Sequence, residues 1–305
     1  MTLNQFYPIG TPGHPWSADE KHQWQQSQTR SRSYQRDVLD VLDTLQHRYD
    51  VIQYGELRYA DDVYPLMAVK SKRWDDALPV ALVTGGVHGY ETSGVMGALT
   101  FLSECQDEYA GKINLLVAPC ISPWAYEHIA RWNFEAVDPN RQFFLEGAAE
   151  ESQALMRLIA AQNGRFAVHV DLHETTDTDE SEFSPARSAR DGVAYTPENI
   201  PDGYYLVSNT RNSRLDFQSA LIAAVAQVTH IAPSEPGETV LGYPVTGPGI
   251  VEYDNNAWHL CSTITDAPFT TTTEVYPDSA DATPEQCTRA QVVTVRRAIE
   301  FALSN

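Results

Sequence analysis

The segment "LPVALVTGGVHGYETSG", residues 78–94, joins a continuously apolar run to two glycines and then to His88 and Glu91. Such an apolar run is typical of a strand covered on both faces in a mostly parallel sheet. The glycines let the chain turn sharply, and "TSGVMGALTFLSEC", residues 92–105, has the pattern of a buried helix. We therefore predict that His88 and Glu91 follow the carboxyl end of a strand, where ligand sites of such sheets gather.

The His-x-x-Glu spacing alone is weak evidence for a metal site. Nine histidines and 41 acidic residues in 305 positions predict about one such pair by composition. A second pair, His47-x-x-Asp50, does occur, at the end of a predicted helix with no glycines around it. We interpret that pair as solvated, so the hypothesis for His88 and Glu91 depends on their surroundings.

The rest of the chain alternates predicted strands with predicted helices, which indicates an α/β fold with a mixed, mainly parallel sheet flanked by helices. Residues 1–30 are predicted to be an irregular N-terminal arm, and residues 31–305 a single catalytic domain. The segment from 181 to 257 is predicted to be largely irregular around one helix. Further predicted strands cover 51–59 and 63–70 as a hairpin, 113–119, 165–174 and 267–277; further helices cover 34–49, 151–162 and 216–230, and a last one follows Thr283.

Composition restricts the functional classes. A chain with 42% hydrophobic and 10% aromatic residues is globular, and no apolar run approaches the roughly 20 residues that span a bilayer. The net charge of -20 argues against nucleic acids and anionic membranes as partners. The first residues show no signal-peptide pattern, so we expect a cytoplasmic protein whose four scattered cysteines are buried or free thiols.

A third candidate ligand, His173, also stands at the end of a predicted strand, 165–174. Two histidines and one carboxylate leave a fourth position open for water, which is the pattern of a catalytic zinc site with one Zn²⁺ ion. In "HVDLHE", the two-residue period of a strand places His169, Asp171 and His173 on one face. Asp171 either accepts a hydrogen bond from a metal-bound histidine or is simply a strand-end acid, whereas His169 is predicted to be a core residue.

Three further residues could act beside such a metal. Arg141 is the last residue of the turn "DPNR", and Arg131 lies ten residues earlier. An arginine can grip a carboxylate with two hydrogen bonds or stabilise an oxyanion. Glu274 ends the β-branched run "TTTTEVYP", and its carboxylate could take a proton from water and deliver it to a leaving amine. Each of these side chains alone is more typical of a solvated charge, so only their conjunction favours a site.

Four of these motifs occur together in a known family. The motifs "GGVHGYE", "DPNRQF", "DLHE" and "TTTTEVYP" follow one another as they do in the zinc carboxypeptidases. The chain also resembles their relatives, the aspartoacylase and succinylglutamate desuccinylase deacylases. The resemblance covers residues 51–301 and implies the zinc carboxypeptidase fold.

The resemblance also implies roles for individual residues. It implies zinc bound by His88, Glu91 and His173, and a general base and acid at Glu274. Arg131 is similar to the arginine that polarises the scissile carbonyl, and Asn140 with Arg141 to the pair that holds the substrate carboxylate. Tyr253, in "GIVEYDN", is a plausible counterpart of the family's tyrosine, and Tyr243 competes with it.

The sequence departs from the family in ways that leave the branch open. The wording His-Gly-Tyr-Glu is closer to the deacylases, "DPNRQF" replaces the commoner Asp-Leu-Asn-Arg-x-Phe, and residues 181–257 align with no motif. The leading hypothesis is a metallocarboxypeptidase acting on peptides; the alternatives are a deacylase of N-acyl amino acids and an inactive binding protein that keeps the fold. Neither the substrate side chain nor the oligomeric state can be predicted.

Overall fold

The computed structural model describes all residues except 1–6, 60, 106, 198 and 235–236. Its described strands form one ten-stranded sheet in the order β1-β2-β4-β3-β5-β10-β6-β9-β8-β7. The strands are β1 (Tyr49–Tyr59), β2 (Asp62–Ser71), β3 (Val80–Gly85), β4 (Asn114–Ala118), β5 (Phe166–Glu174), β6 (Tyr205–Asn209), β7 (Thr239–Val240), β8 (Tyr243–Gly247), β9 (Ile250–Tyr253) and β10 (Phe269–Val275). The sheet is mixed, as predicted.

Parallel pairing is concentrated in the centre of the sheet, where β4, β3, β5 and β10 run side by side in the same direction. The edges are antiparallel, through the predicted hairpin of β1 and β2 at one side and β8 with β9 at the other. Because the central strands are parallel, their carboxyl ends meet at one edge. The strand β3 is buried along its whole length, as its continuous apolar sequence predicts.

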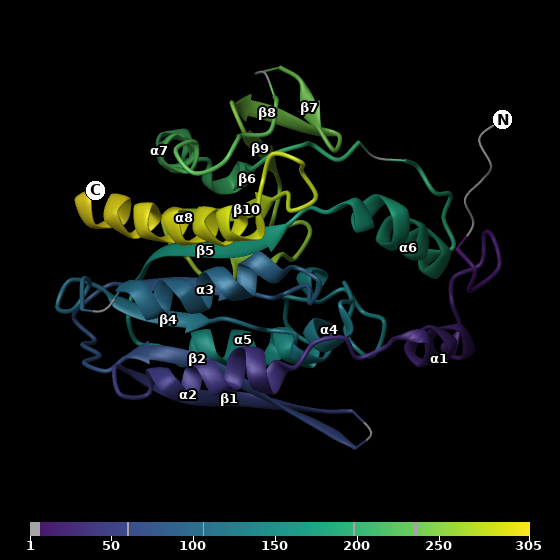
Figure 1. Cartoon of the computed structure of the whole chain (residues 1–305), viewed down its shortest axis with the longest axis horizontal. Helices are drawn as coiled ribbons and strands as arrows, with labels where there is room; N and C mark the ends of the chain where they lie inside the picture. Colours follow the sequence, from purple (N-terminus) through teal and green to yellow (C-terminus); the bar gives the residue numbers. More distant parts are fainter. Residues whose placement is uncertain (1–6, 60, 106, 198, 235–236) are drawn as a thin grey trace.

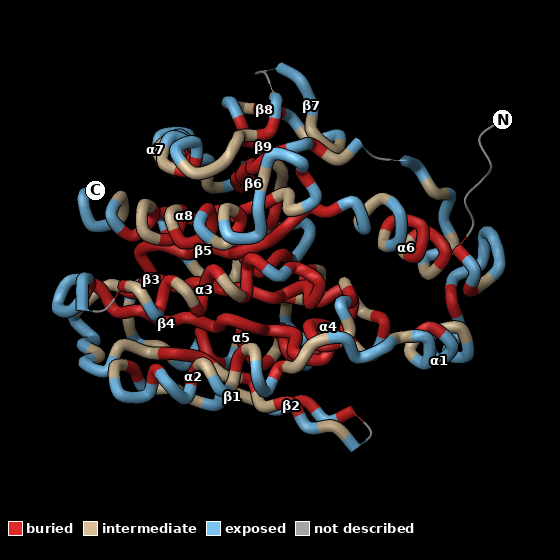
Figure 2. The backbone as a smooth tube through the Cα atoms, viewed as in Figure 1, coloured by how far each residue is buried: buried red, intermediate tan, exposed pale blue. Residues whose placement is uncertain are grey.

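Helices cover both faces of the sheet (Figure 1). On one face α3 and α8 pack together over β5, with α2 and α7 beside them, and α5 packs against β1 on the other. Buried residues fill the space between the sheet and the helices on each of its faces (Figure 2). The helices are α1 (Ala18–Ser27), α2 (Asp40–Leu45), α3 (Thr92–Cys105), α4 (Pro123–His128), α5 (Glu150–Ala160), α6 (Ser184–Asp191), α7 (Leu215–Val225) and α8 (Pro284–Ser304), with a π-helical turn at Gln35–Leu39.

The last helix begins as its sequence predicts. The Thr283 side chain accepts a hydrogen bond from the backbone of Gln286, and the Gln286 side chain accepts one from the backbone of Thr283. This reciprocal pair satisfies two backbone donors that a helix start otherwise leaves unpaired.

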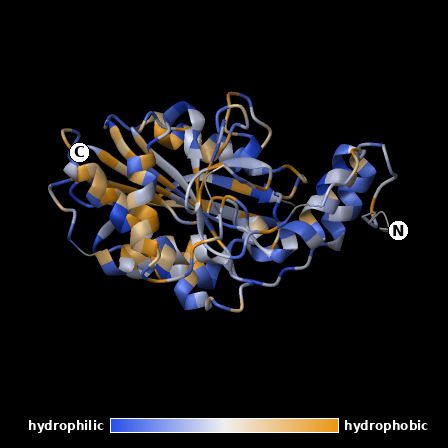
Figure 3. Ribbon diagram, turned by 90° about the horizontal axis from the view of Figure 1, so that it is seen from above, coloured by the Kyte–Doolittle hydropathy of each residue, from blue (hydrophilic) through white to orange (hydrophobic). Residues whose placement is uncertain are grey.

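The N-terminal segment corrects one prediction. Residues 18–27 form the helix α1, which begins at a capping box between Ser17 and Glu20, so the arm 1–30 is not irregular throughout. Trp24 of this helix is buried, with its ring centroid 5.4 Å from that of Trp132. This helix was not predicted, because Trp24 is its one buried residue and a single apolar residue gives no helical period. The end of the molecule near the N-terminus is correspondingly hydrophilic (Figure 3).

The region 181–257 also holds more regular structure than predicted. Besides α7 it contains α6 and the strands β6, β7, β8 and β9. These strands are only two to five residues long, which is too short for a clear two-residue hydrophobic period. Their place in the sheet is set by pairing, since β6 adds to β10 and β9 adds to β6.

Two smaller findings concern whole-chain properties. Among the described helices none is both long and apolar enough to cross a bilayer. All four cysteines are buried and free, in agreement with their scattered positions.

A buried carboxyl group organises the loop that leads to "DPNR". Glu151, in the first turn of α5, is fully buried; it accepts a hydrogen bond from Asn133 Nδ2 at 3.3 Å, and its Oε1 lies 3.5 Å from Ser122 Oγ. Asn133 Oδ1 in turn accepts the backbone N–H groups of Glu135 and Val137. Burial raises the pKa of Glu151 from its ordinary value of 4.5 to about 7.

This pKa predicts a pH-dependent stability. Between pH 4.5 and 7 the folded protein holds a proton on Glu151 that the unfolded chain releases, so the stability contributed by this group falls as the pH rises. Glu151→Gln removes that dependence. Its free energy of unfolding, relative to wild type, should increase by about 3 kcal/mol from pH 4.5 to pH 8, because each pKa unit corresponds to roughly 1.4 kcal/mol. Urea denaturation at both pH values measures it, and an unchanged difference would contradict the buried proton.

Candidate metal centre

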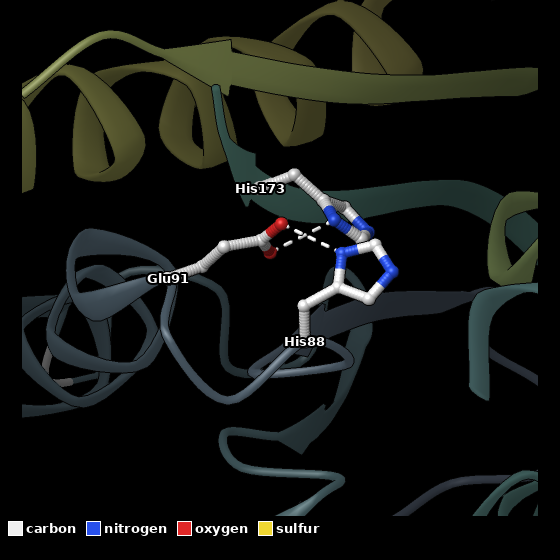
Figure 4. A group of neighbouring side chains, drawn as sticks. All are labelled: His88, Glu91 and His173. Atoms are coloured by element: carbon white, nitrogen blue, oxygen red, sulfur yellow. Dashed lines mark hydrogen bonds and ion pairs between the residues drawn. The ribbon is translucent and has the colours of Figure 1, made fainter. Parts of the chain in front are cut away.

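Three predicted ligands meet at the carboxyl edge of the central strands. His88 and Glu91 lie in the loop between β3 and α3, and His173 lies near the end of β5. Strands β3 and β5 are parallel neighbours, with Gly85 paired to Leu172, so the loop and His173 share one edge. Figure 4 shows the two imidazole rings and the Glu91 carboxylate turned toward one another.

The geometry of the loop depends on Gly89. A Cβ atom at this position would lie 1.9 Å from the carbonyl carbon of Ala125, closer than any real contact. The N–H groups of Gly89 and Tyr90 also donate to the carbonyl oxygen of Ala130. The glycine between the two ligands therefore lets the loop press against α4, which fixes the directions of His88 and Glu91.

The ligand atoms are close together and buried. His88 Nδ1 lies 2.7 Å from Glu91 Oε1, and His173 Nδ1 lies 2.9 Å from Glu91 Oε2. One atom from each of the three residues lies within 4.8 Å of the others. The three residues are at most 3% exposed.

The opposite nitrogen of each ring has a carboxylate partner. His88 Nε2 lies 3.0 Å from Asp138 Oδ1, and His173 Nε2 lies 2.9 Å from Asp171 Oδ2. A carboxylate accepts hydrogen bonds but does not donate them, so each Nε2 carries the proton. Each Nδ1 faces the Glu91 carboxylate, and once its proton is lost the neutral ring offers a lone pair there, so that the centre then presents only acceptors. Such a set fits a cation, and oriented histidines of this kind are typical of zinc sites.

The pKa values reflect this crowding of acceptors. Burial opposes ionisation of Glu91, but the neighbouring His173 and His88 outweigh it and hold the pKa at about 2. Burial likewise opposes charging of His173, but Glu91 and Asp171 hold its pKa well above the usual range. The pocket therefore stabilises positive charge among these groups, whether carried by a proton or by a metal ion.

Glu174 joins the two segments that carry the ligands. Its carboxylate accepts the backbone N–H groups of Ser93 at 2.7 Å and Thr92 at 2.9 Å, at the start of α3. Because Glu174 follows His173 directly, this bond ties the end of β5 to the helix that follows Glu91. A negative group at a helix N-terminus is electrostatically favourable.

Glu274 lies beside the ligands, on β10. It pairs in register with His173 on one side and with Tyr205 of β6 on the other. Its Oε2 accepts a hydrogen bond from Thr175 Oγ1 at 2.8 Å. Burial raises the pKa of Glu274 to about 7, with His173 opposing the shift and Glu91 adding to it. A carboxylate with such a pKa can exchange a proton near neutrality.

Arg131 reaches the same pocket and is held by two carboxylates. Its Nε lies 3.3 Å from Asp138 Oδ2, and its Nη1 lies 3.1 Å from Asp179 Oδ1. Tyr90 Oη, between the ligands in sequence, donates to Asp179 at 2.9 Å. Asp138 therefore links Arg131 to His88, and Asp179, from the acidic segment "DTDESE" at residues 177–182, lines the same pocket.

Asn140 and Arg141 lie in a 3-10 turn at Pro139–Arg141, and both line the pocket. Asn140 Oδ1 accepts the backbone N–H of Cys261 at 2.8 Å, and its Nδ2 lies 3.4 Å from His173 Nε2. Arg141 keeps its guanidinium 5.4 Å from the ring centre of Trp258. The structure thus places the predicted pair at the pocket, where the Asn140 side chain is hydrogen-bonded to the backbone of Cys261.

The two candidate tyrosines are neighbours. Tyr253 and Tyr243 both line the pocket, and their ring centroids are 4.3 Å apart. Burial raises the pKa of Tyr253 above its usual range. Position alone therefore does not choose between them.

Sequence reasoning missed several residues of the site. The motif "DPNR" includes Asp138, for which the sequence analysis predicts only a place in a turn, and Asp179 is in none of the predicted motifs. The signal for Asp138 was available, since metal-bound histidines regularly donate their second N–H to a carboxylate. Asp179 had no such signal, because only the fold brings it to Arg131. His169 is a core residue as predicted, with its Nε2 3.0 Å from Thr84 Oγ1.

Comparisons with known proteins rest on structure. No protein-family model matches the sequence. No curated protein matches it either. Among solved structures, a "putative metallopeptidase" from Shewanella amazonensis matches with a TM-score of 0.67 and 19% identity, over 90% of this chain and 98% of that one.

Two further structures extend the comparison. A metallo-carboxypeptidase from Burkholderia cenocepacia has a TM-score of 0.60 at 14% identity, over 95% of this chain and 70% of that one. Carboxypeptidase A from Helicoverpa armigera has a TM-score of 0.57 at 12% identity, over 96% and 74%. At these identities the likeness concerns the fold alone. The chain has the mixed α/β fold of carboxypeptidase A-like structures, as the sequence motifs predicted.

Proposed function

We propose that the protein is a zinc-dependent hydrolase that cleaves an amide bond next to a free carboxylate, as a metallocarboxypeptidase does. The observation that carries this proposal is the buried convergence of His88 Nδ1, His173 Nδ1 and the Glu91 carboxylate. Arg131, Arg141 and Glu274 line the same pocket. The fold shared with the metallo-carboxypeptidase from Burkholderia cenocepacia supports the same reaction class.

His88, Glu91 and His173 would hold the zinc ion, with Asp138 and Asp171 orienting the two rings. When bound, zinc supplies Lewis-acid chemistry that makes water a nucleophile near neutral pH and polarises a carbonyl group. The burial of the three ligands excludes bulk water, which strengthens every electrostatic interaction in the site.

Glu274 is the proton carrier in this proposal. Its carboxylate takes a proton from the attacking water and delivers it to the leaving amine. The pKa of about 7 suits both steps, because the group can bind and release the proton near neutrality. The Thr175 hydroxyl orients the carboxylate through its hydrogen bond to Oε2.

The two arginines bind different oxygen atoms of the substrate in this proposal. Arg131 donates hydrogen bonds to the carbonyl oxygen as negative charge develops on it, and Asp138 and Asp179 keep the guanidinium in place. Arg141 grips the free carboxylate, and the Trp258 ring beside it limits the positions of the guanidinium. A deacylase of N-acyl amino acids would use the same residues, so substrate length separates the two reactions.

The ligand set is tested by zinc stoichiometry. Purified protein saturated with zinc and then dialysed should hold one ion per chain. His173→Ala should reduce zinc affinity by at least about 100-fold, because one of the three side chains that would bind the ion directly is lost. Atomic absorption and competition with a chelator measure both. His47→Ala is the matched control, since His47 is exposed and belongs to the other His-x-x-acid pair. Full zinc retention by His173→Ala would refute the site.

The proton carrier is tested by Glu274→Gln, which keeps the size of the side chain but removes its basic oxygen. We expect zinc to stay bound and kcat for blocked dipeptides and N-acetyl amino acids to fall by about 1,000-fold. Glu56→Gln, at an exposed position of β1, should keep wild-type turnover. Near-normal turnover by Glu274→Gln would show that another group moves the proton.

A further inference from the structure

We propose that the substrate residue carrying the free carboxylate has an apolar side chain, and that Val251 is a specificity-determining residue for it. This inference rests on the proposed hydrolysis and deepens it. Val251 lines the pocket that contains the metal centre and is 2% exposed. The proposed catalytic chemistry does not require an apolar wall at this place. The apolar residues of the wall therefore indicate which substrate side chain packs against them.

Strand pairing places an apolar wall next to Glu274. In β10, Thr272 lies two residues before Glu274 and therefore points to the same face of the sheet. Thr272 pairs with Val207 of β6, and Val207 pairs with Val251 of β9. All three line the pocket, so a row of short, uncharged side chains extends from the proton carrier along one wall.

A small hydrophobic cluster stands behind this wall. Val207, Val251 and Val245 form it with Tyr205 and Ala232. Val240, Leu241, Tyr243 and Tyr253 pack against the cluster, and each of these four also lines the pocket. The wall is therefore the pocket-facing side of a packed apolar unit, against which an aliphatic or aromatic side chain would lose its contact with water.

Charged groups enter the pocket from other elements. Asp179 and Arg187 come from the segment after β5, and Arg141 comes from the turn at Pro139–Arg141. Glu274 comes from β10, and its carboxylate accepts a hydrogen bond from Thr175. Among the described residues of β6, β7, β8 and β9 that line the pocket, none is a lysine, arginine, histidine, aspartate or glutamate. A charged substrate side chain packed against these strands would lose water and find no charged partner on them, which is unfavourable.

The test uses zinc-loaded wild-type protein and blocked dipeptides that differ only in the terminal residue. We expect kcat/KM for leucine and phenylalanine to exceed that for lysine and aspartate by at least about 100-fold. Binding of the free amino acids is measured in parallel by the shift in Tm, which does not depend on turnover. L-leucine should raise Tm, whereas L-lysine and L-aspartate at the same concentration should leave it nearly unchanged.

A matched pair of variants assigns the selection to Val251. Val251→Thr keeps the shape but places a hydroxyl group at the wall, and should lower the leucine-to-lysine ratio of kcat/KM by about 10-fold. Val245→Thr is the control, because Val245 pairs with Val251 and belongs to the same buried cluster but does not line the pocket. It should lose similar stability and keep the ratio within about twofold.

The outcomes separate this inference from the proposed function. Equal turnover of all terminal residues, or a preference for lysine or aspartate, would support hydrolysis and overturn the apolar selection. No turnover with selective binding of L-leucine would refute the hydrolase and support the selection. No turnover and no selective binding would overturn both. An equal fall in the leucine-to-lysine ratio of kcat/KM in Val251→Thr and Val245→Thr would overturn the role of Val251.

Discussion

The site depends on one electrostatic constraint, which is the burial of three hydrogen-bond acceptors within reach of one another. Two Nδ1 atoms face the carboxylate of Glu91, while Asp138 and Asp171 occupy the opposite nitrogens. Without a positive charge between them these atoms would repel one another in a medium that screens poorly. A proton or a cation between them removes this repulsion, and the surrounding contacts restrict how far the side chains can turn away.

The fold supplies that rigidity through paired strands and through contacts between loops. Neighbouring parallel strands bring the β3 loop and the end of β5 to one edge, and Glu174 ties that end to the start of α3. Gly89 lets the ligand loop lie against α4. The strands beyond β10 then add an apolar wall to a pocket whose other side chains are largely polar. The proposed ligands and this apolar wall thus come from different parts of the sheet.

The central layer could be predicted from the sequence because its signals are strong. A long apolar run followed by glycines predicted β3 and its ligand loop, and the capping box predicted the start of α8. The short strands of the region 181–257 were missed, since their two to five residues carry no clear period and they form by pairing with one another and, for β6, with β10. Asp179 was missed for a related reason: its contact with Arg131 spans 48 positions and exists only in the fold.

The most direct test of the central claim is the position of the metal itself. Anomalous diffraction from crystals of the zinc-loaded protein should show one peak bounded by His88 Nδ1, His173 Nδ1 and the Glu91 carboxylate, with both Nε2 atoms still on Asp138 and Asp171. A zinc peak elsewhere, for instance at the buried cluster of His169, Asp171 and Cys261, would contradict the account. So would coordination of zinc through either Nε2 atom.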